Sequence, residues 1–287
     1  MPSGPKKMNK SEVASIFYHN IFDYPLTLSE LEKWKVGKRV KLLRKKMPLV
    51  ESKNGFYFLK QSASIIVRRK KRERASEKKL LIAKKAARVL SRIPSLKMIG
   101  VTGSLAMKNA GEDSDIDIIV ITQKGTLWIT RALSWLVLKI MGLEVRKPND
   151  KRQKDKLCLN IWLDENDLAW EKRNIYTAHE ICQIRPLLNR QGAYENFIEK
   201  NKWVFDFWPN AKASVYKKRN PKMKKNGRVF NLLCGFLEKP AFIFQKFYMA
   251  GKITTEVATP TRAVFHPRDF SKLIISKLKA VQPRSTP

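Results

Sequence analysis

The stretch of sequence that decides the fold is residues 100–122, GVTGSLAMKNAGEDSDIDIIVIT. One apolar segment ends in Gly103-Ser104, and a second, rich in isoleucine and valine, begins at Asp115. This pattern predicts a strand, a short helix and a second strand, in that order, at residues 97–102, 104–110 and 115–122. A strand that enters a helix through a glycine and is followed by another strand indicates an α/β core.

Four residues of this stretch predict a site for a phosphate and a cation. Gly103 lets the backbone approach a ligand closely, and Ser104 with the amides of a helix N-terminus can hold a phosphate. Asp115 and Asp117 are two residues apart in a strand, so their side chains project from the same face. Two close carboxylates repel each other unless a cation lies between them, and oxygen ligands beside a triphosphate suit Mg²⁺.

These residues resemble the signature of the polymerase-beta-like nucleotidyltransferase superfamily, which is Gly-Ser followed about ten residues later by Asp-x-Asp between apolar residues. They are most similar to the minimal nucleotidyltransferases, whose segment often runs Gly-Ser-x-Ala and then DSDID. The matching positions are Gly103, Ser104, Ala106, Asp113, Ser114, Asp115, Ile116 and Asp117. The order of segments along most of the chain also resembles uncharacterised nucleotidyltransferase-domain proteins of uncultivated bacterial lineages.

The resemblance implies an α/β (α+β) nucleotidyltransferase core with a mixed sheet. It also implies transfer of a nucleoside monophosphate from an NTP to a hydroxyl, with release of pyrophosphate and dependence on Mg²⁺ or Mn²⁺. In this interpretation Gly103 and Ser104 hold the β- and γ-phosphates, and Asp115 and Asp117 bind the metal and are catalytic. The acceptor stays open between an RNA end, a small molecule and a protein side chain.

One departure concerns the third carboxylate, which the superfamily supplies from a later strand. The later strand here is expected at residues 157–163, and its central polar residue is Asn160. An amide oxygen ligates a metal weakly, and an amide takes no proton. Asp155 and Asp164 flank the strand, and by alternation Asp164 shares the face of Asn160. Three interpretations follow: Asn160 completes a weaker catalytic site, one flanking aspartate does so, or the site binds nucleotide without turnover.

The whole chain is expected to have five parts. They are a disordered tail (1–10), a winged-helix-like module (11–60), a basic helical connector (61–94), the transferase core (95–170) and a helical C-terminal region (171–287). In the module, Thr27 and Glu30 have the spacing of a capping box, and Asn54-Gly55 predicts a hairpin turn. A basic helix at 38–46 and the lysine-tipped hairpin would suit nucleic acid. In the last part, we expect helices at about 177–188, 194–207, 228–249 and 269–279.

The charge of the chain points to anionic partners. Lys and Arg total 59 and Asp and Glu total 25, which gives a formal net charge of +34. The basic residues concentrate in three runs, at residues 35–46, 68–74 and 217–228. Such a charge attracts polyanions, so an NTP, RNA or another nucleic acid, or an anionic membrane surface are the natural partners. The charge by itself names no reaction.

Composition excludes several classes of protein. Hydrophobic residues make up 43%, which is too much for a wholly disordered chain. The three cysteines, Cys158, Cys182 and Cys234, have neither the number for a disulfide scaffold nor the spacing of a zinc site. The apolar segments at 127–143 and 229–249 are interrupted by charged residues, so we expect no transmembrane segment. We therefore expect a cytoplasmic protein, with the 229–249 segment packed on the core rather than on a membrane.

Two competing functions stay open at this point. In one, the protein is a nucleic-acid-binding regulator whose transferase domain binds nucleotide without catalysis. In the other, it is an antitoxin-like protein that nucleotidylates a partner protein. The histidines do not discriminate between them, because His19, His179 and His266 are scattered and are expected to be structural.

Overall fold

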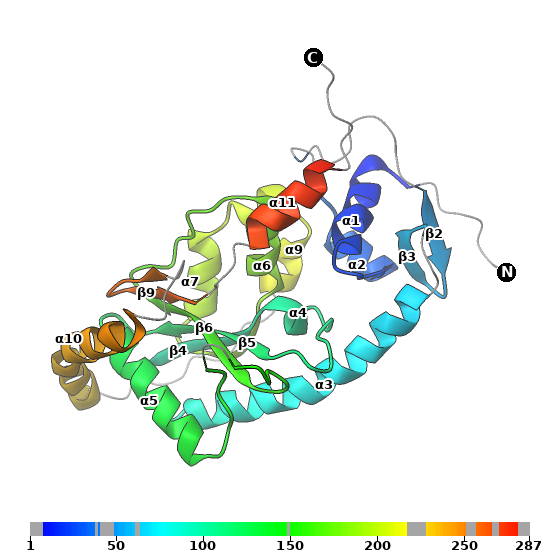
Figure 1. Cartoon of the computed structure of the whole chain (residues 1–287). Coiled ribbons are helices and arrows are strands. Elements are labelled where there is room, and N and C mark those ends of the chain that lie inside the picture. Colours follow the sequence, from blue (N-terminus) through cyan, green and yellow to red (C-terminus); the bar gives the residue numbers. More distant parts are fainter. Residues whose placement is uncertain are drawn as a thin grey trace.

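The structure is a computed structural model, which describes residues 8–37, 40, 49–60, 64–147, 150–216, 228–250, 257–265 and 270–280. Within these ranges, a six-stranded sheet carries helices on both faces, and a small N-terminal module packs beside it (Figure 1). The expected tail at 1–10, the expected basic helix at 38–46 and the basic run at 217–228 lie mostly outside the described residues.

The described helices are α1 (Lys10–Asn20), α2 (Leu28–Lys33), α3 (Ser64–Leu90), α4 (Gly103–Ala106), α5 (Leu127–Ile140), α6 (Ile175–Gln183), α7 (Ala193–Lys200), α8 (Val204–Phe207), α9 (Ala211–Tyr216), α10 (Arg228–Ala250) and α11 (Phe270–Ala280). The described strands are β1 (Leu26–Thr27), β2 (Val50–Lys53), β3 (Phe56–Leu59), β4 (Leu96–Val101), β5 (Ile116–Thr122), β6 (Leu157–Asp164), β7 (Arg185–Asn189), β8 (Val257–Ala258) and β9 (Arg262–Val264).

The main sheet has the strand order β7-β4-β5-β6-β9-β8. Among the described strands, β5 and β6 are the one parallel pair, and the other neighbours are antiparallel. A parallel pair needs a long crossover connection, and here that connection contains α5. The mixed sheet that the resemblance implies is therefore confirmed.

Alternate residues of β5 face two hydrophobic clusters on opposite sides of the sheet. Ile119 and Ile121 pack with buried residues of α1, α6 and α7. Ile118 and Val120 pack with buried residues of α3 and α5. Helices cover both faces, so the strand is apolar almost throughout, and the two aspartates at its beginning stand out from this pattern.

The N-terminal module contains α1, α2 and a three-stranded antiparallel sheet of order β1-β3-β2. The capping box is confirmed: the Thr27 side chain accepts from the backbone of Glu30, and the Glu30 carboxylate accepts from the Thr27 N–H. The hairpin turn is confirmed too, with positive φ at Asn54 and Gly55. The winged-helix assignment stays a prediction, because the helix that would contact nucleic acid falls outside the described residues.

The connector is a single 27-residue helix, α3, that joins the module to the sheet. The helix continues without a break through Ala75 and Ser76. Ser76 Oγ donates to the Arg72 carbonyl oxygen (2.7 Å) and accepts from the Ala110 N–H (3.0 Å). Ser76 therefore joins α3 to the segment after α4 through a hydrogen bond, and it does not end the helix.

The C-terminal region differs from the prediction of an all-helical extension. The helix expected at 177–188 is divided into α6 and the strand β7. Pro186 cannot continue a helix and keeps Arg185 extended, and β7 is an edge strand, where a proline is tolerated. The prediction is wrong in this respect, because residues beyond 170 supply β7, β8 and β9 to the main sheet.

α10 packs on α5, as expected for this segment. The Glu238 carboxylate accepts from the backbone N–H groups of Trp128 (2.8 Å) and Ile129 (3.0 Å), so it caps the first turn of α5. The opposite side of α10 is exposed and apolar, with Phe244 and Phe247 at its centre. None of the helices in the described ranges combines the length and hydropathy needed to cross a bilayer.

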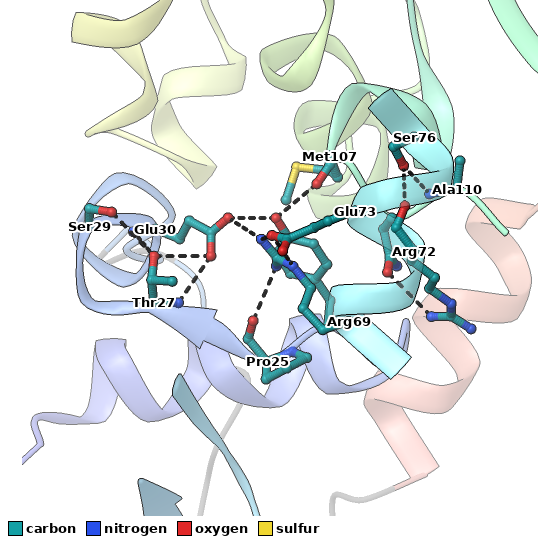
Figure 2. Close-up of polar contacts among 12 residues, drawn as sticks. Pro25, Thr27, Ser29, Glu30, Arg69, Arg72, Glu73, Ser76, Met107 and Ala110 are labelled. Carbon is teal, nitrogen blue, oxygen red and sulfur yellow. Dashed lines mark hydrogen bonds and ion pairs between the residues drawn. The ribbon is translucent and has the colours of Figure 1, made fainter. Parts of the chain in front are cut away.

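A buried polar network joins the module to α3 and to the core (Figure 2). Arg69 of α3 is 3% exposed, donates to Glu30 (2.8 Å) and lies 3.7 Å from the Tyr24 ring. Burial would raise the pKa of Glu30, but Arg69 lowers it below its usual value. Tyr24 Oη lies 2.6 Å from Glu30 and 2.9 Å from the carbonyl oxygen of Met107. The network therefore extends to the segment that follows α4.

His19 of α1 and His179 of α6 form a second junction between module and core, with their Nε2 atoms 3.2 Å apart. His19 Nδ1 donates to the Ser15 carbonyl oxygen (2.8 Å), so in the neutral ring its Nε2 accepts from His179. Both rings are buried among Tyr18, Trp34 and other aromatic side chains. Burial lowers the pKa of His19 to about 4 and that of His179 well below its ordinary value.

Removing Arg69 should destabilise the junction strongly, because Glu30 would keep its charge without its cation. We expect Arg69→Leu to lower the free energy of unfolding by about 3 kcal/mol. The matched control is Arg68→Leu, whose ion pair with Asp23 is exposed and should contribute less than about 1 kcal/mol. Urea denaturation of both variants measures the difference, and equal losses would contradict a buried network at Arg69.

The histidine pair should make the fold sensitive to acid. The unfolded chain binds more protons than the folded chain between pH 6.5 and about 4, so stability falls as the pH drops through this range. The loss for His19 is about 3 kcal/mol at the acid end. We expect His19→Gln/His179→Gln to flatten the curve of unfolding free energy against pH. An unaltered curve in the double variant would argue against the pair.

Candidate nucleotidyltransferase site

The glycine turn lies directly against Asp117. Gly103 opens α4 with a φ of +57°, a conformation that favours glycine. A Cβ at this position would lie 2.6 Å from Asp117 Oδ2, closer than side-chain atoms pack. The Thr102 N–H donates to the Asp117 carbonyl oxygen (3.0 Å), which holds the turn beside β5. Ser104 follows in α4 and is exposed. The structure thus brings together the turn and the strand that the sequence predicts to form one site.

Asp115 and Asp117 share a small polar space with Arg146. Arg146 Nη1 lies 2.6 Å from Asp115 Oδ2, and the Asp115 side chain is only 13% exposed. Burial and the charge of Asp115 raise the pKa of Asp117 to about 7, although Arg146 acts in the opposite direction. One guanidinium therefore offsets the repulsion only in part, and a further cation would stabilise both carboxylates in the ionised form.

Asn160 lies at a bulge in β6 and contacts Asp117. The register with β5 passes from Ile118 opposite Leu159 to Ile119 opposite Ile161, which leaves Asn160 as the extra residue. Its Nδ2 donates to Asp117 Oδ1 (2.7 Å). Its Oδ1 is buried and has no hydrogen-bond partner among the described residues. An unpaired buried oxygen beside two carboxylates is suited to a metal ion or a ligand hydroxyl.

The donor set fits a hard divalent cation. Carboxylate oxygens of Asp115 and Asp117 and the sulfur of Cys158 lie within 4.8 Å of one another. Burial and the neighbouring aspartates raise the pKa of the Cys158 thiol, so it stays neutral and is a poor ligand. The oxygens of the aspartates, with Asn160 Oδ1, are the ligands that Mg²⁺ or Mn²⁺ would use.

Comparison with known families agrees with this geometry. The sequence model of the family described as the nucleotidyltransferase domain matches residues 83–226, which is half of the chain. The chain belongs to the nucleotidyltransferase domain family. The matched residues include the glycine turn, both aspartates and Asn160, so the resemblance that these residues suggest is confirmed at the level of the family.

Two solved structures are similar to part of this nucleotidyltransferase. One is a toxin-antitoxin with AMP-PNP, 19% identical over 49% of this chain and 93% of that chain, with a TM-score of 0.26. The other is a mutant of the toxin-antitoxin MntA-HpeT, 16% identical over 46% of this chain and 88% of that chain, with a TM-score of 0.24. No curated protein matches the chain. The family assignment rests on the domain match.

The two flanking aspartates do not lie beside Asp117 in this nucleotidyltransferase. Asp155 precedes β6, and its carboxylate is 2.7 Å from Lys79 Nζ. Asp164 lies at the far end of β6, opposite Thr122, and accepts from the Gly125 N–H before α5. The expectation that Asp164 shares the face of Asn160 is wrong, because the bulge at Asn160 interrupts the alternation of β6.

Glu180 of α6 is a third carboxyl group near the site, and no sequence motif predicts it there. It accepts from the backbone N–H of Gly103 and from Gln183 Nε2, the latter at 2.7 Å. Burial and the charge of Asp117 raise the pKa of Glu180 to about 8, so the group is protonated at neutral pH. A neutral carboxyl here orients the glycine turn without adding a third negative charge to the pair.

Neither Glu180 nor Arg146 carries a signal that a motif search would use. Glu180 lies on a helix of ordinary amphipathic composition, 63 residues after Asp117, and Arg146 is one of 59 basic residues. The contact of Arg146 depends on the bridge between Val145 and Leu157, which carries the segment after α5 alongside β6. Both contacts are products of tertiary packing.

Two glycine variants can distinguish backbone strain at Gly103 from a direct clash with Asp117. We expect Gly103→Ala to displace Asp117 and to lower transferase activity by about 100-fold. The matched control is Gly142→Ala, which has nearly the same φ, +64°, but open space around the added methyl. Both variants should lose about 1 kcal/mol of stability from backbone strain, measured by thermal unfolding. Equal activity in the two variants would contradict the close contact with Asp117.

Proposed function

We propose that this nucleotidyltransferase moves a nucleoside monophosphate from an NTP to a hydroxyl acceptor and releases pyrophosphate, with Mg²⁺ or Mn²⁺. The observation that carries the proposal is the crowding of Asp115 and Asp117 against the Gly103 turn, next to the unpaired oxygen of Asn160. Such a site is electrostatically incomplete without a cation, and an NTP brings its own divalent ion.

Each residue has a distinct part in this proposal. Asp115 and Asp117 hold the metal, which would activate the attacking hydroxyl and neutralise charge on the leaving pyrophosphate. Asn160 fixes the orientation of Asp117 through its amide N–H. Arg146 is 30% exposed beside Asp115, where it can also pair with a phosphate oxygen. Because Glu180 engages the Gly103 N–H, the phosphates would contact the exposed Ser104 rather than that amide.

The proton of the acceptor needs a destination other than Asn160, since an amide takes no proton. Glu180 is protonated and faces the glycine turn, so it is not available either. The proton would pass to a carboxylate of the Asp115–Asp117 pair or to solvent. We therefore propose that Asn160 acts as a positioning residue in a catalytic site with two carboxylates.

The test is transfer of label from each α-labelled NTP, with Mg²⁺ or Mn²⁺, to a cell extract that contains RNA and protein. We expect transfer by the wild type and less than about one-hundredth of it in Asp115→Asn/Asp117→Asn, because both metal ligands lose their charge. Thermal unfolding of the double variant checks that it folds. Cys182→Ala, a change at a buried residue of the hydrophobic core, controls for a general effect of substitution.

The class of labelled acceptor separates the alternatives. Label on RNA or a small molecule supports the proposed reaction with that acceptor, and label on a co-purifying protein supports the antitoxin-like alternative. Nucleotide binding without any transfer would overturn the enzymatic proposal and favour the nucleic-acid-binding regulator.

A further inference from the structure

Basic side chains line a hollow between α3 and the turn that leads into β5. The hollow has a volume of about 370 Å³ and is lined by Lys70, Lys71, Arg74 and Lys78 of α3 and by Glu112. Lys70, Arg74 and Lys78 recur every four residues, so they form a row with a rise of about 6 Å between neighbours. None of these three forms an ion pair with another described residue, so their charges are available to a ligand.

A second basic hollow is lined by the next residue of the same turn, Asp113. It has a volume of about 430 Å³ and is lined by Lys151, Arg152 and Lys154, with Asp113. Glu112 connects the two hollows, because its carboxylate lies 3.4 Å from Lys71 Nζ and 3.8 Å from Lys154 Nζ. We call these seven basic residues of the two hollows the basic strip.

The basic strip is held at a fixed position relative to the catalytic carboxylates. Lys79 is 1% exposed, and its Nζ donates to the carbonyl oxygens of Glu112 (2.9 Å) and Ser114 (2.7 Å) and to Asp155 (2.7 Å). This buried lysine clamps α3, the turn at 111–114 and the segment before β6 together. Asp115 follows the turn directly in the sequence, so the strip is held near the carboxylate pair.

The strip is shaped for an extended polyanion. A single phosphate would need convergent donors, whereas these side chains are spread along a helix and around a turn. The two acidic side chains of the hollows, Glu112 and Asp113, leave the basic strip with a net positive charge. The Glu112 carboxylate already faces Lys71 and Lys154. Figure 1 shows α3 along the outer edge of the molecule, with the segment between α4 and β5 against its middle, so a long ligand has access.

We propose that the basic strip binds the phosphodiester backbone of a nucleic-acid acceptor and directs its terminal hydroxyl toward Asp115 and Asp117. The binding site stands on the charges and hollows of α3 and the turn, and the direction of the hydroxyl rests on the proposed function. Backbone contacts of this kind are independent of base sequence and strongly dependent on salt.

The test compares two triple variants of α3 with the same change in charge. Lys70→Gln/Arg74→Gln/Lys78→Gln removes the row in the strip, and Lys84→Gln/Lys85→Gln/Arg88→Gln removes three exposed charges further along the helix. Fluorescence anisotropy measures binding of a labelled RNA oligonucleotide, and of DNA of the same sequence, without NTP. We expect the strip variant to bind about 10-fold more weakly or worse, and the control to change less than about 2-fold.

The salt dependence gives a second readout. Loss of three phosphate contacts should reduce the slope of log Kobs against log salt by about 2 for a single strand. Equal weakening in the two variants would mean that the charge acts without a defined site, and would overturn the proposal. Undetectable binding to both nucleic acids would do the same, as would strip-dependent binding only to vesicles of phosphatidylcholine and phosphatidylglycerol.

The binding site and the reaction can fail separately. Asp115→Asn/Asp117→Asn should bind RNA as the wild type does while transferring no label. Strip-dependent binding with no transfer by the wild type would overturn the proposed function but leave the binding site. Transfer to a protein or small molecule that the strip variant retains in full, with no transfer to nucleic acid, would overturn the strip as an acceptor site and leave the reaction.

Discussion

The contact between Gly103 and Asp117 is the constraint on which the rest of the site depends. The turn comes so close to the carboxylate that no side chain fits between them, and this places the beginning of α4 beside the beginning of β5. This packing has an electrostatic cost, because it brings the Asp117 carboxylate close to that of Asp115. The guanidinium of Arg146 offsets the repulsion between these two carboxylates only in part. Three side chains from different parts of the fold respond to this repulsion. Arg146 pairs with Asp115, Asn160 donates a hydrogen bond to Asp117, and Glu180 is neutral and adds no further negative charge.

α3 connects that site to the rest of the molecule. Its first half carries Arg69 into the network with Glu30 and Tyr24, and its last turns pack on the sheet. Between them, Ser76 and Lys79 hold the segment from Ala110 to Ser114. One helix thus positions both the N-terminal module and the turn that precedes Asp115 and Asp117, so a ligand bound along α3 would lie near this carboxylate pair without any change of fold.

Charge has two separate roles in this chain. Buried cations such as Arg69 and Lys79 are fully used in holding the structure together, each facing carboxylates or carbonyl oxygens. Exposed cations such as Lys70, Arg74 and Lys78 lie on the same helix, two of them directly beside Arg69 and Lys79 in the sequence, and have no described acidic partner. The net charge of +34 describes both groups alike, and only their burial separates structural cations from those available to a ligand.

The sequence by itself determined the strand–turn–helix–strand segment, the same-face placement of Asp115 and Asp117, the capping box at Thr27 and the hairpin turn at Asn54. These are local features, set by backbone sterics, side-chain period and turn chemistry within a few residues. Tertiary structure alone decided the bulge at Asn160, which puts Asp164 on the opposite face of β6, the strand β7, the approach of Glu180 and Arg146, and the pairing of His19 with His179. Register shifts and contacts between residues distant in the chain depend on how whole elements pack, and the local pattern of residues carries no signal for them.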